Sequence, residues 1–148
     1  VLTLLLLAAP AAPLGLTALV PQDTLNALLA RKQQITQVET LAAPLVLDEE
    51  PDLLRDIDAL WFIDNSGAEA GLIKGYSGED HSAALIGLAH ISLARRNARV
   101  WFEHVPSPVN PSDRLSRAGL DHAWTRKQGW DLREEARPDF ADLLGLPL

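Results

Sequence analysis

The chain has 148 residues, of which 13 are Lys or Arg and 20 are Asp or Glu, so its formal net charge is −7. This length suits one domain with a single core, and the negative balance excludes a protein that binds nucleic acid through overall positive charge. The absence of cysteine excludes a disulfide framework and any thiolate metal site, and it fits an intracellular location in the cytoplasm or the nucleus.

The first 20 residues are strongly apolar, but they predict neither a membrane span nor a signal peptide. Two prolines and a glycine interrupt the run, and it contains no Lys or Arg. A span needs an uninterrupted run of about 20 apolar residues, and a signal peptide begins with a basic segment. We therefore predict a hairpin of two buried strands, Leu2 to Leu7 and Leu16 to Val20, and no membrane contact.

Helices are predicted after the hairpin. A short helix capped by Asp23 or Thr24 runs through Arg31, because leucines recur there at helical spacing. A second helix starts near Thr36. We expect Pro44 to interrupt or kink it, since proline lacks the amide and clashes with the preceding turn.

The middle of the chain alternates between predicted strands and helices. The acidic run at 48–52 contains proline and is predicted to be a solvated turn, not a metal site. A buried strand, Ala59 to Ile63, precedes a helix from Gly67 to Lys74. A longer helix opens between Ser77 and Asp80, and the strand Val100 to Val105 follows it.

Two aspartates follow these elements at positions where α/β proteins place catalytic groups. Asp64 comes directly after the strand Ala59 to Ile63, and Asp113 comes after a proline-rich loop. A divalent-metal phosphodiesterase needs such carboxylates, because in-line attack on a phosphate is commonly served by two metals about 4 Å apart that share acidic ligands. The pair therefore indicates metal-dependent chemistry on a phosphodiester.

Two motifs around these aspartates carry a family resemblance. The first is Phe-Ile-Asp-Asn-Ser at residues 62–66, and the second is Val-Pro-Ser-x-x-Asn-Pro-x-Asp-x-x-Ser-Arg at residues 105–117. Together they resemble the ribonuclease H domain at the end of reverse transcriptases, in the branch shared by hepadnavirus polymerases and certain eukaryotic retroelements. On this basis residues 1–117 are a ribonuclease H-like domain, and residues 118–148 are a C-terminal extension that we expect to be helical.

The resemblance implies an α/β fold with a ribonuclease H-like mixed sheet, whose first three strands are antiparallel and whose later strands are parallel, with helices on its faces. It implies hydrolysis of the RNA strand of an RNA–DNA hybrid with Mg²⁺ or Mn²⁺, and an upstream reverse transcriptase domain of the same polypeptide as partner. The implied catalytic and metal-binding residues are Glu39, Asp64 and Asp113, and the implied substrate contacts are Asn65, Ser66, Asn110 and Arg117.

The family's site has a fourth carboxylate, on its first strand, that has no counterpart here. No acidic residue precedes Asp23, and the sequence begins with Val1. We therefore expect that strand upstream of the sequence given, and slow or no cleavage by this chain alone. The alternative function is a catalytically inactive ribonuclease H-like module that positions nucleic acid or partner domains. A small secreted binding domain, with the first residues as its signal peptide, is the third reading.

Several of these residues also have an ordinary structural explanation. Glu39 completes a capping-box pattern with Thr36, and Asp64 has the position of a helix N-cap. Arg117 pairs with either a carboxylate or a phosphate. His104 is expected to make ordinary hydrogen bonds, and the other three histidines show no metal-ligand spacing.

Overall fold

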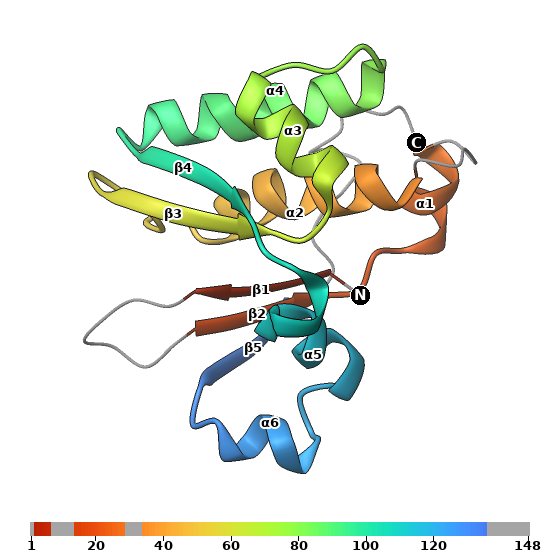
Figure 1. The fold of residues 1–148 in the computed structure, drawn as a ribbon, viewed down its shortest axis with the longest axis vertical. Helices are drawn as coiled ribbons and strands as arrows, with labels where there is room; N and C mark the ends of the chain where they lie inside the picture. Colours follow the sequence, from red (N-terminus) through yellow and green to blue (C-terminus); the bar gives the residue numbers. More distant parts are fainter. Residues whose placement is uncertain (1, 7–13, 29–33, 136–148) are drawn as a thin grey trace.

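The computed structural model describes residues 2–6, 14–28 and 34–135 as an α/β fold in which helices pack against two small sheets (Figure 1). One sheet has three strands in the order β1-β2-β5, and the other pairs β3 with β4. The strands are β1 (Leu2–Leu6), β2 (Leu14–Ala18), β3 (Asp58–Ile63), β4 (Arg99–His104) and β5 (Asp131–Glu135).

The first four helices follow the expected order along the chain, whereas the helix that contains Asp113 was not predicted. A 3₁₀ turn at Ser107–Val109 precedes the fifth of them. Their bounds are α1 (Gln22–Ala27), α2 (Gln34–Glu49), α3 (Ser66–Lys74), α4 (Asp80–Arg95), α5 (Pro111–Ala118) and α6 (Ala123–Lys127). In the residues that the structure describes, no helix combines the length and the apolar character needed to cross a membrane.

The predicted N-terminal hairpin is confirmed, because β1 and β2 pair antiparallel with Leu4 opposite Leu16. Its second strand begins at Leu14, two residues before the predicted Leu16, and its turn lies outside the described residues. Strand β5 extends this sheet by pairing parallel to β2. The extension at 118–148 was expected to be helical, and in its described part it contributes both α6 and this strand.

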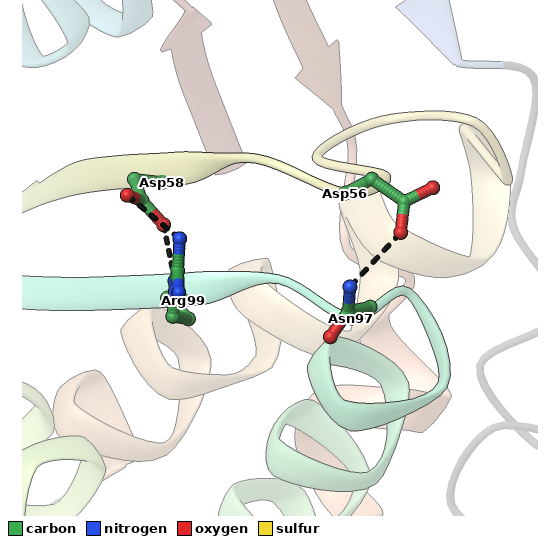
Figure 2. Close-up of polar contacts among 4 residues, drawn as sticks. All are labelled: Asp56, Asp58, Asn97 and Arg99. Atoms are coloured by element: carbon green, nitrogen blue, oxygen red, sulfur yellow. Dashed lines mark hydrogen bonds and ion pairs between the residues drawn. The ribbon is translucent and has the colours of Figure 1, made fainter.

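The second sheet confirms the predicted parallel strands. Asp58 lies opposite Arg99 at the start of the pair, and Ile63 lies opposite His104 at its end. Figure 2 shows the starting end, where Asp58 and Arg99 form an exposed ion pair of 2.5 Å and the Asn97 amide donates to Asp56 at 3.0 Å. Because the strands are parallel, both begin at this end of the sheet, and Asp64 follows β3 at the other end.

The single mixed sheet expected from the sequence occurs here as two separate sheets. Within the described ranges β1 pairs only with β2, and β3 pairs only with β4. Strands β1, β3 and β4 therefore each keep one edge without a backbone partner in that part of the chain.

The outer face of the β3–β4 pair is apolar and exposed. Leu60, Phe62 and Trp101 keep 67%, 55% and 66% of their surface accessible. Alternate residues on the same strands, including Ile63 and Phe102, are buried in the core beneath α3 and α4. The pair is thus covered on one face only, although parallel strands are usually covered on both.

The predicted cap of the first helix and the predicted interruption of the second are both wrong. Pro21 is the N-cap of α1 and makes no side-chain cap, whereas Asp23 and Thr24 lie inside the helix. The predicted end of this helix at Arg31 lies outside the described residues. Helix α2 continues through Pro44, which is fully buried in its middle.

Burial explains why α2 tolerates its proline. Leu41 and Leu45 belong to the core cluster around α1 and β2, while Val46 and Leu47 belong to the cluster beneath the β3–β4 sheet. A proline in a helix interior costs about 3 kcal/mol, and each fully buried aliphatic side chain contributes about 1.5–3 kcal/mol. A helix that joins both cores therefore outweighs the local penalty.

Helix α3 packs against α2 at a glycine. A Cβ atom added to Gly67 would lie 2.9 Å from the Thr36 Cγ2 atom and 3.1 Å from the Thr36 Oγ1 atom. Real Cβ contacts are longer, so the absence of a side chain at Gly67 sets how closely the two helices approach. This contact matters because α2 carries Glu39 and α3 begins beside Asp64.

We predict that Gly67→Ala lowers the free energy of unfolding by about 1 kcal/mol, because overpacking at the helix contact outweighs the gain in helix propensity. Gly87→Ala in α4 is the matched control, since no atom lies within 4 Å of its added Cβ. That change should stabilise the protein by about 0.5–1 kcal/mol. Urea unfolding of both variants measures the difference, and equal effects would contradict the close contact.

Candidate functional site

Asp64 follows β3 directly and lies at the point where the strand meets α3. The amide of Val105 donates to the carbonyl of Ile63 at 3.0 Å, which holds the end of β3 against the end of β4. Asn65, not Asp64, is the N-cap of α3, because its Oδ1 accepts from the amides of Gly67 and Ala68 at 3.0 Å each. The N-cap explanation of Asp64 is therefore wrong.

The Asp64 side chain is half-buried, and its carboxylate has no hydrogen-bond or ion-pair partner among the described residues. Its backbone continues into the first turn of α3, where the helix dipole favours negative charge. A carboxylate in this position is available to a ligand.

Asp113 lies in the first turn of α5. The turn is fixed by Asn110, whose Oδ1 accepts from the amide of Ser112 at 3.0 Å, and by Leu115, which is fully buried. Arg117 lies one turn later and its Nε is 3.1 Å from Asp113 Oδ1. Of the two partners left open for Arg117, the structure shows the carboxylate. The pair is solvent-exposed on the arginine side, so it contributes little to stability.

Glu39 projects from α2 and does not serve as a helix cap. The helix has already begun by Gln34, so Thr36 lies within it, and the Thr36 carbonyl accepts from the Thr40 hydroxyl at 2.7 Å. The capping-box explanation of Glu39 is therefore wrong, because it needs Thr36 at the N-cap. Gln37 and Thr40 are buried, while Glu39 keeps exposed surface.

The three acids lie close enough to interact. Although Glu39 keeps exposed surface, partial burial of its carboxyl raises its pKa above the usual 4.5, and the charges of Asp64 and Asp113 raise that pKa further. Like charges act in this way only when they are near one another. The structure thus brings together Glu39, Asp64 and Asp113 from α2, the end of β3 and α5, while their role as metal ligands stays a prediction.

Comparison of the chain with known protein families, with curated proteins and with solved structures finds no match.

The three acids have the ligand chemistry that Mg²⁺ prefers, but they are not arranged to coordinate one ion. Carboxylate oxygens are the ligands that Mg²⁺ prefers, and a divalent cation would relieve the repulsion that raises the pKa of Glu39. Within residues 2–6, 14–28 and 34–135, however, no three Asp, Glu, His or Cys side chains are placed to hold one metal ion. The charges of Asp64 and Asp113 both act on Glu39, but these residues alone do not form the ligand geometry of a metal site.

We predict that Glu39→Gln stabilises the protein near neutral pH by about 0.5 kcal/mol, a small effect because the side chain is exposed. The folded state binds this proton more tightly than the unfolded chain, so ionised Glu39 destabilises the fold. The stabilisation that protonated Glu39 contributes is lost as the pH rises from about 4.5 through the raised pKa. Urea unfolding should show the gain at neutral pH and none well below pH 4.5; a gain that persists in acid would contradict the assignment.

Two residues beside the site, His104 and Glu69, were not predicted from the sequence to form an ion pair. His104 ends β4 opposite Ile63, and its Nδ1 lies 3.6 Å from Glu69 Oε2 in the first turn of α3. The sequence predicts only ordinary hydrogen bonds for His104. The useful signal was the parallel register, which places the last residue of β4 beside the residue that precedes Asp64.

A polar cavity of about 290 Å³ adjoins the same helices. Thr36 precedes Glu39 by one turn, and Gly67 follows the Asn65 cap. The cavity is therefore lined by neighbours of Glu39 and Asp64 along the chain, and not by the acids themselves. Hydroxyl groups and an ammonium group supply hydrogen-bond donors among its lining residues, which include Thr36, Gly67, Lys74, Tyr76, Ser77 and Ser82.

Proposed function

We propose that the chain is a ribonuclease H-like domain of a retroelement reverse transcriptase, which hydrolyses the RNA strand of RNA–DNA hybrids with Mg²⁺ or Mn²⁺. One observation carries the proposal: Asp64 and Asp113, the acids of the two motifs, both act on the pKa of Glu39, the acid of α2. Residues that the family resemblance names, and that are distant in sequence, thus share one electrostatic environment.

Bound divalent ions would supply an activated water and stabilise the leaving oxygen. The chain's own residues divide the remaining tasks. Glu39, Asp64 and Asp113 would provide the negative charge that holds such cations. Arg117 engages Asp113 through one carboxylate oxygen, so the other oxygen remains for a ligand.

Four residues are proposed to contact the substrate: Asn65, Ser66, Asn110 and Arg117. The caps of α3 and α5 occupy the side-chain oxygens of Asn65 and Asn110. The side-chain NH₂ groups of Asn65 and Asn110 make no hydrogen bond in the part of the chain that the structure describes, so they are available to sugar or phosphate oxygens. Ser66 is exposed at the start of α3 and offers a hydroxyl beside them.

The two separate sheets support a place for the implied first strand. The free edges of β1 and β3 are each able to pair with one more strand, and a strand between them would join both sheets into the mixed sheet that the family resemblance implies. We propose that this strand carries the fourth carboxylate and brings the acids into ligand geometry.

A second candidate is a catalytically inactive ribonuclease H-like module that positions nucleic acid or a neighbouring domain. The observation that favours it is the lack of any three suitably placed ligands among the described residues. The net charge of −7 also disfavours strong binding of a hybrid by the chain alone.

An end-labelled RNA–DNA hybrid distinguishes the two candidates. The 148-residue chain is compared with the same chain extended upstream by an aspartate-bearing strand, with Mg²⁺ and with a chelator. We expect RNA-strand cleavage by the extended chain only with the metal, and slow or no cleavage by the shorter chain.

NMR titration of the Glu39 carboxyl provides a readout besides activity. Its raised pKa should fall when Mg²⁺ is added, because a bound cation favours the ionised form. No cleavage by the extended chain, together with a Glu39 pKa that Mg²⁺ leaves unchanged, would establish the inactive module instead.

A further inference from the structure

The segment from α5 to α6 is locally basic in an otherwise acidic chain. Between residues 111 and 127 there are four basic and two acidic side chains, although the whole chain carries −7. All four cations are exposed: Arg114, Arg117, Arg126 and Lys127. Ion pairs engage Arg117 with Asp113 at 3.1 Å and Arg126 with Asp121 at 2.8 Å. Arg114 and Lys127 form no ion pair with described residues.

Arg114 is held by an aromatic side chain and not by an acid. Its Cζ atom lies 4.1 Å from the centre of the Trp124 ring. Trp124 in turn meets Trp130 edge to face, with ring centres 5.6 Å apart and planes at 86°. A guanidinium over an aromatic face is attracted to the ring while its N–H groups remain free to bind an anion.

Helix α6 has only five residues, so its position depends on contacts outside its own backbone. The fully buried Thr125 provides one, because its hydroxyl donates to the Gly119 carbonyl at 2.7 Å. The His122 Nδ1 atom caps the helix by accepting from the Trp124 amide at 3.1 Å. Trp124 is therefore fixed relative to α5, and Arg114 is pre-organised over it.

The geometry points to a contact surface for the sugar–phosphate backbone of a nucleic acid, made by Arg114 over Trp124 together with Lys127. Arg114 follows Asp113 in the chain, so a phosphodiester bound at the acids would place neighbouring phosphates near α5. A guanidinium binds a phosphate through two parallel N–H groups, and its ordering by Trp124 lowers the entropy lost on binding. This inference rests on the proposed function for its ligand.

The test is hybrid binding, measured by fluorescence anisotropy with a labelled RNA–DNA duplex and the full chain in chelator. Arg114→Gln should weaken binding about tenfold and lower the salt slope by about one, since one phosphate contact is lost. Arg55→Gln is the matched control: Arg55 is also an exposed arginine, it pairs with Asp52 at 3.3 Å, and it lies outside α5 and α6. The affinity of the Arg55→Gln variant for the hybrid should equal that of the unchanged chain.

Trp124→Leu should also weaken binding, because it removes the ring that orders Arg114 while far-UV circular dichroism reports whether α6 persists. Equal affinities for Arg114→Gln and Arg55→Gln would overturn the surface, and so would a wild-type chain that binds no hybrid at low salt. Hydrolysis is decided separately by the Mg²⁺-dependent cleavage assay. Binding through Arg114 without cleavage would refute the reaction and keep the surface, whereas cleavage with unchanged Arg114→Gln binding would do the reverse.

Discussion

Replacing Asp64 by asparagine is expected to lower Mg²⁺-dependent hybrid cleavage about 100-fold or more, because the change removes a proposed carboxylate ligand of the cations that would stabilise the developing charge on the phosphate. Asparagine keeps the shape of the side chain. Asp64 also has no hydrogen bond or ion pair with other described residues that the substitution would break. The loss should therefore appear in initial cleavage rates of the extended chain and not in its thermal unfolding.

Asp58→Asn is the control for this experiment, since it removes the same charge from the opposite end of the same strand. Asp58 pairs with Arg99 on the exposed face, far along β3 from Asp64 (Figure 2). An exposed ion pair contributes little, so cleavage should stay within a factor of about three of the parent rate. A similar loss in both variants would mean that net charge, not a site at Asp64, governs the reaction.

Replacing Glu79 by alanine is expected to lower the free energy of unfolding by about 2 kcal/mol near neutral pH, through loss of a helix cap and of buried hydrogen bonds. Glu79 is the N-cap of α4 and accepts from the amides of His81 and Ser82 at 3.1 and 2.8 Å. It also accepts from the Ser82 hydroxyl and from the buried Gln37 amide, both at 2.7 Å. The substitution leaves that amide without its partner.

The pH dependence gives this prediction a second check. Burial opposes ionisation of Glu79, but the hydrogen bonds from Ser82, Gln37 and His81 outweigh it and lower the pKa from 4.5 to about 2. The stabilisation is therefore fully present above about pH 4.5 and is lost as the pH falls toward 2. Urea unfolding of Asp80→Asn is the control, since Asp80 is an exposed neighbour. An Asp80→Asn effect as large as that of Glu79→Ala would contradict the cap network.

Local patterns in the sequence were enough to predict much of the α/β arrangement. Alternation and apolar runs located the hairpin and the strands β3 and β4, and the motifs located Asp64 and Asp113. The pattern failed where the decisive energy is not local. Continuity of α2 through Pro44 depends on burial by both cores, and β5 is a mostly charged strand that its pairing with β2 holds in the sheet.

The sequence named the residues of the candidate site but did not predict their geometry. The resemblance named Glu39, Asp64 and Asp113, and in the structure the charges of both aspartates raise the pKa of Glu39, while the role of the three as a site stays a prediction. Whether Glu39 and Asp64 served as caps depended on where α2 and α3 begin, which a sequence pattern gives only to within about two to four residues. The role of Glu79 had no sequence signal, because glutamate is not among the preferred N-cap residues.

The bare outer face of the β3–β4 pair, with Leu60, Phe62 and Trp101 open to water, has a practical consequence for work with the purified chain. Contiguous exposed apolar side chains promote association, and open strand edges add backbone groups that another molecule is able to pair with. The charge of −7 makes the molecules repel one another over longer distances. Salt weakens this repulsion but does not weaken the contact between apolar faces. Precipitation should therefore increase with salt and protein concentration, and a polar substitution at Trp101 should delay its onset.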